Sequence, residues 1–159
     1  IINLQIPAGV SEGMQLSMTG KGNVPVRGGA PGNLLIFIEE KADDFFQREE
    51  NNIHYNLYIS FIDAALGCEP EVPTIGGKVK IKIPAGTQSG KMLRLRSKGI
   101  SDINGYGKGD QLVHVHVWTP QQLTKEEHET LTSLKSALNF APKPSKKEQS
   151  FFDRVRSLF

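Results

Sequence analysis

His114 and His116 are the residues whose spacing first suggests chemistry. Two positions apart on a strand, their side chains share one face and could reach the same metal ion. Metal catalysis typically needs three protein ligands, and no third ligand stands near them in the sequence. We therefore interpret both as solvent-facing strand residues. His54 and His128 have no identifiable partner in the sequence and are interpreted as surface residues.

A glycine-rich segment, residues 105–110, has a composition that suggests a phosphate-binding loop. It lacks the spacing of a Walker motif, and a strand follows it where a phosphate cradle needs a helix N-terminus. A counterpart at residues 28–33 indicates that both segments are turns whose glycines need positive φ.

The chain has one cysteine, Cys68, and no histidine or other base stands beside it, so we expect no nucleophile there. A single cysteine also excludes an internal disulfide and a thiolate zinc cage within the chain. No triad or acid pair is visible. We therefore expect that the chain is not an enzyme and carries no cofactor or metal.

A run of basic residues without any acid occupies residues 78–98. Its members are Lys78, Lys80, Lys82, Lys91, Arg94, Arg96 and Lys98. Strand alternation places the first three on one face and apolar residues on the other. The run is either a solvated sheet face that resists aggregation or a landing site for an acidic peptide tail. For the second interpretation the expected residues are Lys78, Lys80, Lys82, Arg94 and Arg96. Nucleic acid is less expected, because no aromatic residues are interleaved with these lysines.

Residues 34–38 are apolar on both faces of a predicted strand. Either the strand is completely buried, or one face lines an open cleft. A cleft beside an unpaired strand edge captures extended peptides by adding a strand, with side chains read at alternate positions. Both alternatives remain open at the level of the sequence.

Residues 6–38 and 83–115 are two copies of one segment. They align without a gap at an offset of 77, with 11 identities in 33 positions. Two copies of such length indicate two similar domains in tandem and not a solenoid. We predict a mainly β fold, with two tandem β-sandwich-like domains followed by a C-terminal helical segment. The expected domains are residues 1–48, 49–122 and 123–159.

Periodicity predicts the individual elements. Strands are expected at residues 2–6, 14–18, 33–38, 53–59, 79–83, 93–95 and 113–117, with a helical turn at 61–67. Residues 39–50 are expected to form a short helix or turn. A capping box at Thr124–Glu127 predicts a helix with Leu131, Leu134 and Leu138 on one face. Residues 141–150 read as a linker, and Phe151, Phe152, Val155, Leu158 and Phe159 as one apolar stripe.

The bulk properties exclude several classes of protein. The net charge of +2 argues against a general polyanion binder, and no apolar run is long enough to span a membrane. Because the chain starts within a predicted strand and shows no signal peptide, we expect a fragment of a longer cytoplasmic protein. We expect neither nucleic acid nor membrane as a partner.

Several strings together resemble one family, the C-terminal half of the DnaJ J-domain co-chaperones. The strings are residues 6–10, 46–48, 59–61, 64–67, 72–74, 83–91 and 119–123. The resemblance covers about residues 1–138. Asn33, Glu50-Asn51 and Ile75-Gly76 depart from the usual family pattern, and these departures affect turns more than the expected pocket.

The resemblance implies a stress-response chaperone module that binds unfolded polypeptides for hand-over to a DnaK-type chaperone. It implies a homodimer through the C-terminal segment, with Leu131, Leu134 and Leu138 at the interface. The expected client-binding residues are Ile2, Leu4, Leu34, Ile36 and Phe37. Whether Ile36 or Phe37 faces the cleft stays open. The chain has neither the family's His-Pro-Asp motif nor its cysteine repeats, so zinc is expected only upstream of it. The first domain should also lack the strands that precede the zinc region.

Overall fold

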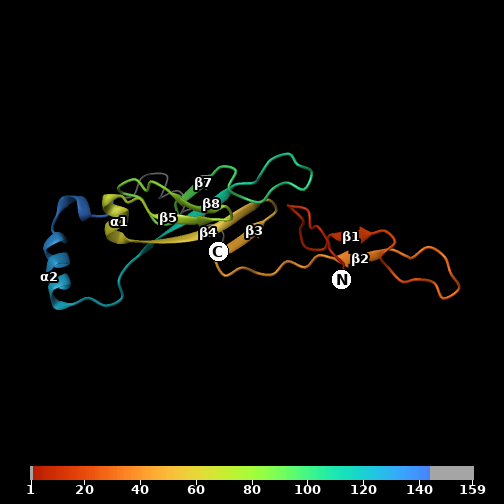
Figure 1. Ribbon diagram of the computed structural model, residues 1–159. Coiled ribbons are helices and arrows are strands. Elements are labelled where there is room, and N and C mark those ends of the chain that lie inside the picture. Colours follow the sequence, from red (N-terminus) through yellow and green to blue (C-terminus); the bar gives the residue numbers. More distant parts are fainter. Residues whose placement is uncertain (1, 144–159) are drawn as a thin grey trace, which may run out of the picture. The chain divides into compact units, whose positions relative to one another are not determined.

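The computed structural model describes residues 2–143, and strands dominate this part of the chain (Figure 1). The strands are β1 Gln15–Met18, β2 Leu34–Phe37, β3 Phe46–Glu49, β4 Asn52–Ser60, β5 Glu71–Thr74, β6 Gly77–Lys80, β7 Met92–Leu95 and β8 Gln111–Trp118. The helices are α1 Phe61–Leu66, α2 Lys125–Leu134 and the short 3₁₀ helix η1 Leu138–Phe140. The predicted mainly β class is confirmed.

Contacts divide the chain into two units, Ile1–Thr119 and Pro120–Phe159. All eight strands lie in the first unit, while α2 and η1 lie in the second. The sequence-based boundary at residue 48 falls inside β3, which pairs with β4. Because β3 pairs with β4 from Phe46 onward, the four-stranded sheet begins at Phe46.

The four-stranded sheet has the order β3-β4-β8-β7, and its central strands β4 and β8 run parallel. One face of this pair is apolar: Val113 and Val115 of β8 are fully buried, and Leu57 and Ile59 of β4 lie beside them in the core. The alternate residues face outward, as the period of two requires. The two faces of the sheet are therefore chemically distinct.

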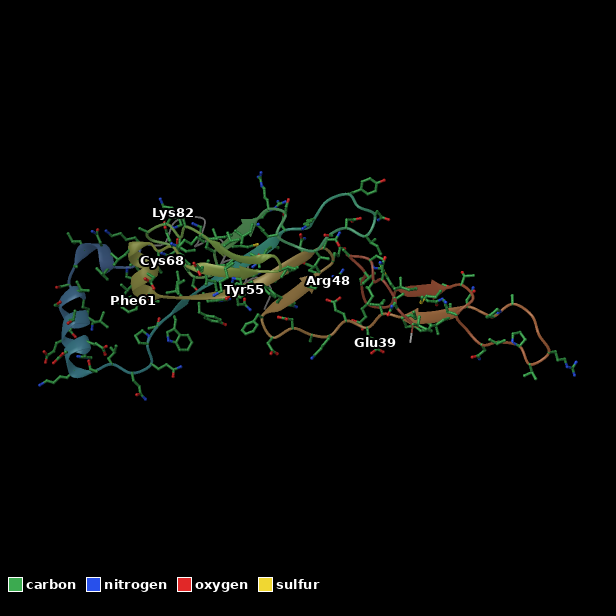
Figure 2. The ribbon with its side chains drawn as sticks, in the orientation of Figure 1. Glu39, Arg48, Tyr55, Phe61, Cys68 and Lys82 are labelled. Carbon is green, nitrogen blue, oxygen red and sulfur yellow. The ribbon has the colours of Figure 1, made fainter. Side chains whose placement is uncertain are left out.

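A second layer, the β5–β6 hairpin with the residues that follow it, covers this apolar face. Val72, Ile81 and Ile83 are buried and pack into the same core as Val113. Each such side chain contributes about 1.5–3 kcal/mol when it leaves water. Tyr55, at the centre of the sheet in Figure 2, packs at the border of this core.

The helical turn predicted at residues 61–67 is confirmed as α1. The Ser60 hydroxyl accepts a hydrogen bond from the Asp63 backbone N–H at 3.0 Å and so caps the helix N-terminus. Gly67, with φ of 85°, ends the helix in a conformation that glycine adopts without steric cost. Figure 2 labels Phe61, the first residue of this helix, and Cys68, which follows its C-cap Gly67.

The duplication seen in the sequence is also a duplication of strand register. Leu16 pairs with Ile36 across β1–β2, and Leu93 pairs with Val113 across β7–β8. All four residue pairs of one hairpin recur in the other at the offset of 77. The backbone hydrogen bond at the end of each hairpin recurs as well. Gly13 N donates to Ile38 O at 3.0 Å, and the equivalent Gly90 N donates to Val115 O at 2.8 Å.

Two predicted elements differ from the structure. Residues 2–6 alternate in polarity but form no strand, because no strand within the described residues pairs with their backbone. Phe46–Glu49, expected within a short helix or turn, is strand β3 instead. This segment is a strand because it pairs with β4 in the same sheet. Only a short turn separates β3 from β4, so the two strands form a tight hairpin.

The capping box of α2 is confirmed. The Thr124 hydroxyl accepts from Glu127 N at 3.3 Å, and the Glu127 carboxylate accepts from Thr124 N at 2.7 Å. The helix ends at Leu134, so Leu138 lies in η1 and not on the predicted helix face.

Hydroxyl groups near its end give a physical reason for this early stop. Thr130, Thr132 and Ser133 donate to backbone carbonyls one turn earlier, which competes with the regular helical bonds. Neither this helix nor any other in the described region has the length and apolarity that crossing a membrane requires. The predicted stripe from Phe151 to Phe159 lies outside the described residues.

Candidate functional site

A groove of about 490 Å³ lies beside β2 in the first copy of the repeat. Its apolar lining consists of Leu4, Ile6, Val10, Ile36, Phe37 and Ile38, and its polar lining of Ser11, Glu12, Glu39, Glu40, Lys41 and Arg48. Apolar side chains that are in contact with water favour binding of an apolar segment. When such a segment binds, its own apolar surface and that of the groove both leave water, which lowers the free energy.

The strand at the groove is not buried. Leu35 and Phe37 are 50% and 68% exposed, while Leu34, Ile36 and Ile38 on the other face are half-buried. Complete burial, one of the two alternatives for this apolar strand, is therefore wrong. Ile36 and Phe37 both line the groove, so neither residue alone answers the question of which one faces it.

The structure brings together three of the five residues expected to bind clients. Leu4, Ile36 and Phe37 line the groove, whereas Ile2 and Leu34 do not. Ile2 is about half exposed, and Leu34 is half-buried opposite Met18.

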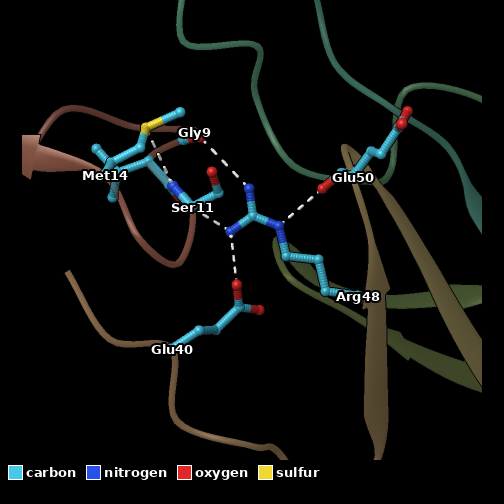
Figure 3. A network of polar contacts seen from close by, with 7 residues as sticks. Gly9, Ser11, Met14, Glu40, Arg48 and Glu50 are labelled. Carbon is cyan, nitrogen blue, oxygen red and sulfur yellow. Dashed lines mark hydrogen bonds and ion pairs between the residues drawn. The ribbon is translucent and has the colours of Figure 1, made fainter.

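Arg48 connects the first hairpin to the four-stranded sheet (Figure 3). Its Nη1 donates to Val10 O at 2.8 Å and its Nη2 to Gly9 O at 3.3 Å, while Nε donates to Glu50 O at 2.7 Å. The side chain is only 17% exposed, and Glu40 adds an ion pair at 3.2 Å. A planar guanidinium suits this arrangement because its donors point in fixed, divergent directions.

This network fixes the loop that forms one wall of the groove, since Val10 lines the groove and its carbonyl is bound by Arg48. Sequence reasoning missed the role of Arg48. The partner carbonyls lie 38 and 39 residues earlier in the chain, and a backbone acceptor leaves no signal in the sequence.

The five residues expected to bind an acidic tail do not form one surface. Lys78, Lys80 and Lys82 are exposed on the β5–β6 layer, and their neighbours Ile81 and Ile83 point into the core. Arg94 lies on the opposite outer face, in β7 of the four-stranded sheet, and Arg96 follows that strand. Arg94 also forms an ion pair with Asp110. The expected single basic sheet is therefore wrong, because the two runs belong to different layers.

Histidines gather on the outer face of the four-stranded sheet. His54 Nδ1 lies 2.8 Å from His114 Nε2, and His54 Nε2 lies 2.7 Å from Glu49 Oε2. His54 thus has partners that sequence reasoning did not identify, because His114 is 60 residues away. His116 Nε2 donates to Asn56 Oδ1 at 3.0 Å. Within residues 2–143 no three metal-binding side chains converge.

Cys68 has the environment of an unreactive thiol. Burial raises its pKa, and the negative charge of Asp63 raises it further. A thiol with a raised pKa holds its proton and is a poor nucleophile near neutral pH.

Comparison with known proteins gives a consistent result. The family model described as DnaJ C terminal domain matches residues 1–120. The chain is 54% identical to Chaperone protein DnaJ of Bacteroides fragilis and 51% identical to that of Bacteroides thetaiotaomicron, over all of this chain and 40% of each relative. It is 45% identical to Chaperone protein DnaJ of Salinibacter ruber, over 99% of this chain and 41% of that protein. The chain thus spans about 40% of the length of the curated relatives it matches.

Proposed function

Since the chain belongs to the DnaJ C-terminal domain family, we propose that it is the client-binding region of a co-chaperone. In this proposal it holds non-native polypeptide for transfer to a DnaK-type chaperone and performs no catalysis of its own. The relatives are named as chaperones, which supports this role.

The observation that carries the proposal is the open apolar groove beside β2. Ile36 and Phe37 both line it, and Leu4 and Ile6 add to its apolar lining. An extended client segment gains about 25 cal/mol for each Å² of apolar surface that it buries there. Non-native polypeptides expose such segments, whereas native proteins rarely expose large contiguous apolar patches.

Hydrogen bonds hold the walls of the groove in place before any client binds. The Arg48 network holds the loop of Gly9 and Val10, and the antiparallel pairing with β1 holds β2. A wall that is already ordered costs less conformational entropy when a client binds. We propose that the dimer, formed through Leu131, Leu134 and Leu138, adds avidity for clients that contact both subunits.

Groove variants of the full chain test the proposal. Ile36→Asp and Phe37→Asp place a charge in the groove, and both should weaken protection of a denatured client against aggregation. Leu35→Asp is the matched control, because Leu35 is exposed on the same strand but does not line the groove. Circular dichroism and urea unfolding identify any variant that loses its fold. Full protection by folded groove variants would contradict the proposal, as would equal loss in the control.

A further inference from the structure

The outer face of the four-stranded sheet carries a row of aromatic rings. His54 and His114 stack with ring centroids 5.1 Å apart, and Tyr58 stacks on His116 at 5.0 Å. Trp118 meets Tyr58 edge-on at 6.5 Å. The row exists because β4 and β8 run side by side in parallel register (Figure 1), which brings outward residues of both strands to one face.

The end of this row is open to water. Tyr58 is 62% exposed and Trp118 is 53% exposed. Tyrosine and tryptophan supply large, rigid contact areas at small entropic cost, and both are enriched where binding energy concentrates. Tyr58 is already held between His116, on which it stacks, and Trp118, which it meets edge-on, so these rings form a preorganised surface for a flat partner group.

A groove of about 480 Å³ beside the row supplies negative charge. His54, His114 and His116 line it together with Asp43 and Asp44. Hydrogen bonds from the backbone N–H groups of Phe45 and Phe46, both 2.9 Å long, lower the pKa of Asp43, so its carboxylate stays ionised. No lysine or arginine is among the described residues that line this groove.

We propose that this outer face is a second binding site, distinct from the groove beside β2, for an arginine side chain on an extended peptide. The guanidinium would stack on His116, which lines the groove and adjoins Tyr58, and donate hydrogen bonds to Asp43 and Asp44. Arginine suits both halves of the site, because its planar group stacks on aromatic faces and its fork of donors matches carboxylates. A single-stranded nucleic acid, which also stacks on aromatic rows, carries phosphates that these two carboxylates repel.

Trp118 is the single tryptophan of the chain, so its fluorescence reports on this site directly. The experiment titrates the full chain with three ten-residue peptides that differ only at two alternate positions, which hold arginine, lysine or glutamate. We expect a saturable change in Trp118 emission with the arginine peptide, binding about fivefold weaker with lysine, and none with glutamate.

Two variants locate the binding. The double variant Asp43→Asn/Asp44→Asn removes both charges but keeps a side-chain oxygen that can accept the backbone hydrogen bonds. Its affinity for the arginine peptide should be about tenfold lower. Tyr58→Leu removes a stacking surface and should weaken binding, whereas Tyr58→Phe should retain it. Ile36→Asp should leave this binding unchanged, which separates the second site from the proposed client groove.

The expected order of peptide affinities, together with the expected effects of the variants, would support the proposed site. Failure of the arginine peptide to saturate, equal binding of the arginine and lysine peptides, or unchanged binding after removal of both carboxylates would each overturn the proposal. Saturable binding of a ten-nucleotide single strand in preference to the arginine peptide would overturn it too.

Discussion

Phe37 and His114 occupy the same position of the repeated unit. Phe37 pairs with Gln15 across β1–β2, and His114 pairs with Met92 across β7–β8, at the same offset of 77. One backbone arrangement therefore presents an apolar ring to a groove in the first copy and an imidazole bonded to His54 in the second. The two hairpins acquired different surfaces without a change of register.

Substitution by alanine should affect the stability of the protein differently at equivalent glycines of the two copies. A Cβ on Gly109 would lie 1.9 Å from Asn51 O, whereas a Cβ on Gly32 has its nearest neighbour at 3.8 Å. We expect Gly109→Ala to lower the free energy of unfolding by about 2–3 kcal/mol, since a backbone neighbour cannot simply rotate away. Gly32→Ala should stay within about 0.5 kcal/mol of wild type. Urea unfolding of both variants measures the difference, and equal stabilities would contradict it.

Arg48→Lys should loosen the loop beside the groove. Lysine offers a single ammonium and cannot donate to Gly9 O, Val10 O and Glu50 O in the geometry of the guanidinium. We expect a loss of about 1–3 kcal/mol in stability and faster amide exchange in residues 9–14. Glu40→Gln removes only the ion pair and should cost less than about 1 kcal/mol. Unaltered exchange in Arg48→Lys would mean that other contacts hold this loop.

The capping box should make the start of α2 sensitive to pH. A hydrogen bond from Thr124 N, and then one with its hydroxyl, lowers the pKa of Glu127 from its ordinary value of 4.5. Stabilisation of the first turn is therefore complete above pH 4.5 and is lost as the pH falls through the lowered value. NMR shifts of residues 125–128 should follow this titration. In Glu127→Gln the same shifts should stay flat, and a titration that persists there would assign it to another group.

Thr124→Ala removes the hydroxyl that caps α2. The change should destabilise the helix by about 1 kcal/mol, because Glu127 N is left without its acceptor. Thr124→Ser keeps an equivalent hydroxyl and serves as the matched control. Helical chemical shifts of residues 125–134 measure both, and full helicity in the alanine variant would show that the cap contributes little.

The proposed homodimer predicts that a chain cut after Thr119 is a monomer, because the cut removes the unit with Leu131, Leu134 and Leu138. Leu138 is largely exposed, which fits a residue that is covered only by a partner subunit. Light scattering on the full and shortened chains measures the mass. A shortened chain that remains a dimer would place the interface in Ile1–Thr119.

Much of the fold follows from local signals. Alternation of polarity locates β1, β4 and β8, and a short continuous apolar run locates β2. The cap at Thr124 locates α2, and the residues around Gly67 locate α1. Phe46–Glu49 could not be recognised, because its acidic and aromatic composition does not alternate clearly and its strand form depends on β4. The site is less predictable still. Three of five expected groove residues meet in space, while Arg48 acts through backbone carbonyls that any residue provides.

The sequence by itself determined the duplication and the approximate positions of most of its strands and turns, because repeated residues, strand periodicity and turn glycines are local properties. Only the tertiary structure decided which of two equivalent residues becomes core. Val113 is fully buried, because Val72 and Ile83 arrive from another layer to cover it, while its counterpart Ile36 stays half-buried beside an open groove. Burial depends on neighbours from distant parts of the chain, and a residue's own type and spacing do not contain that information.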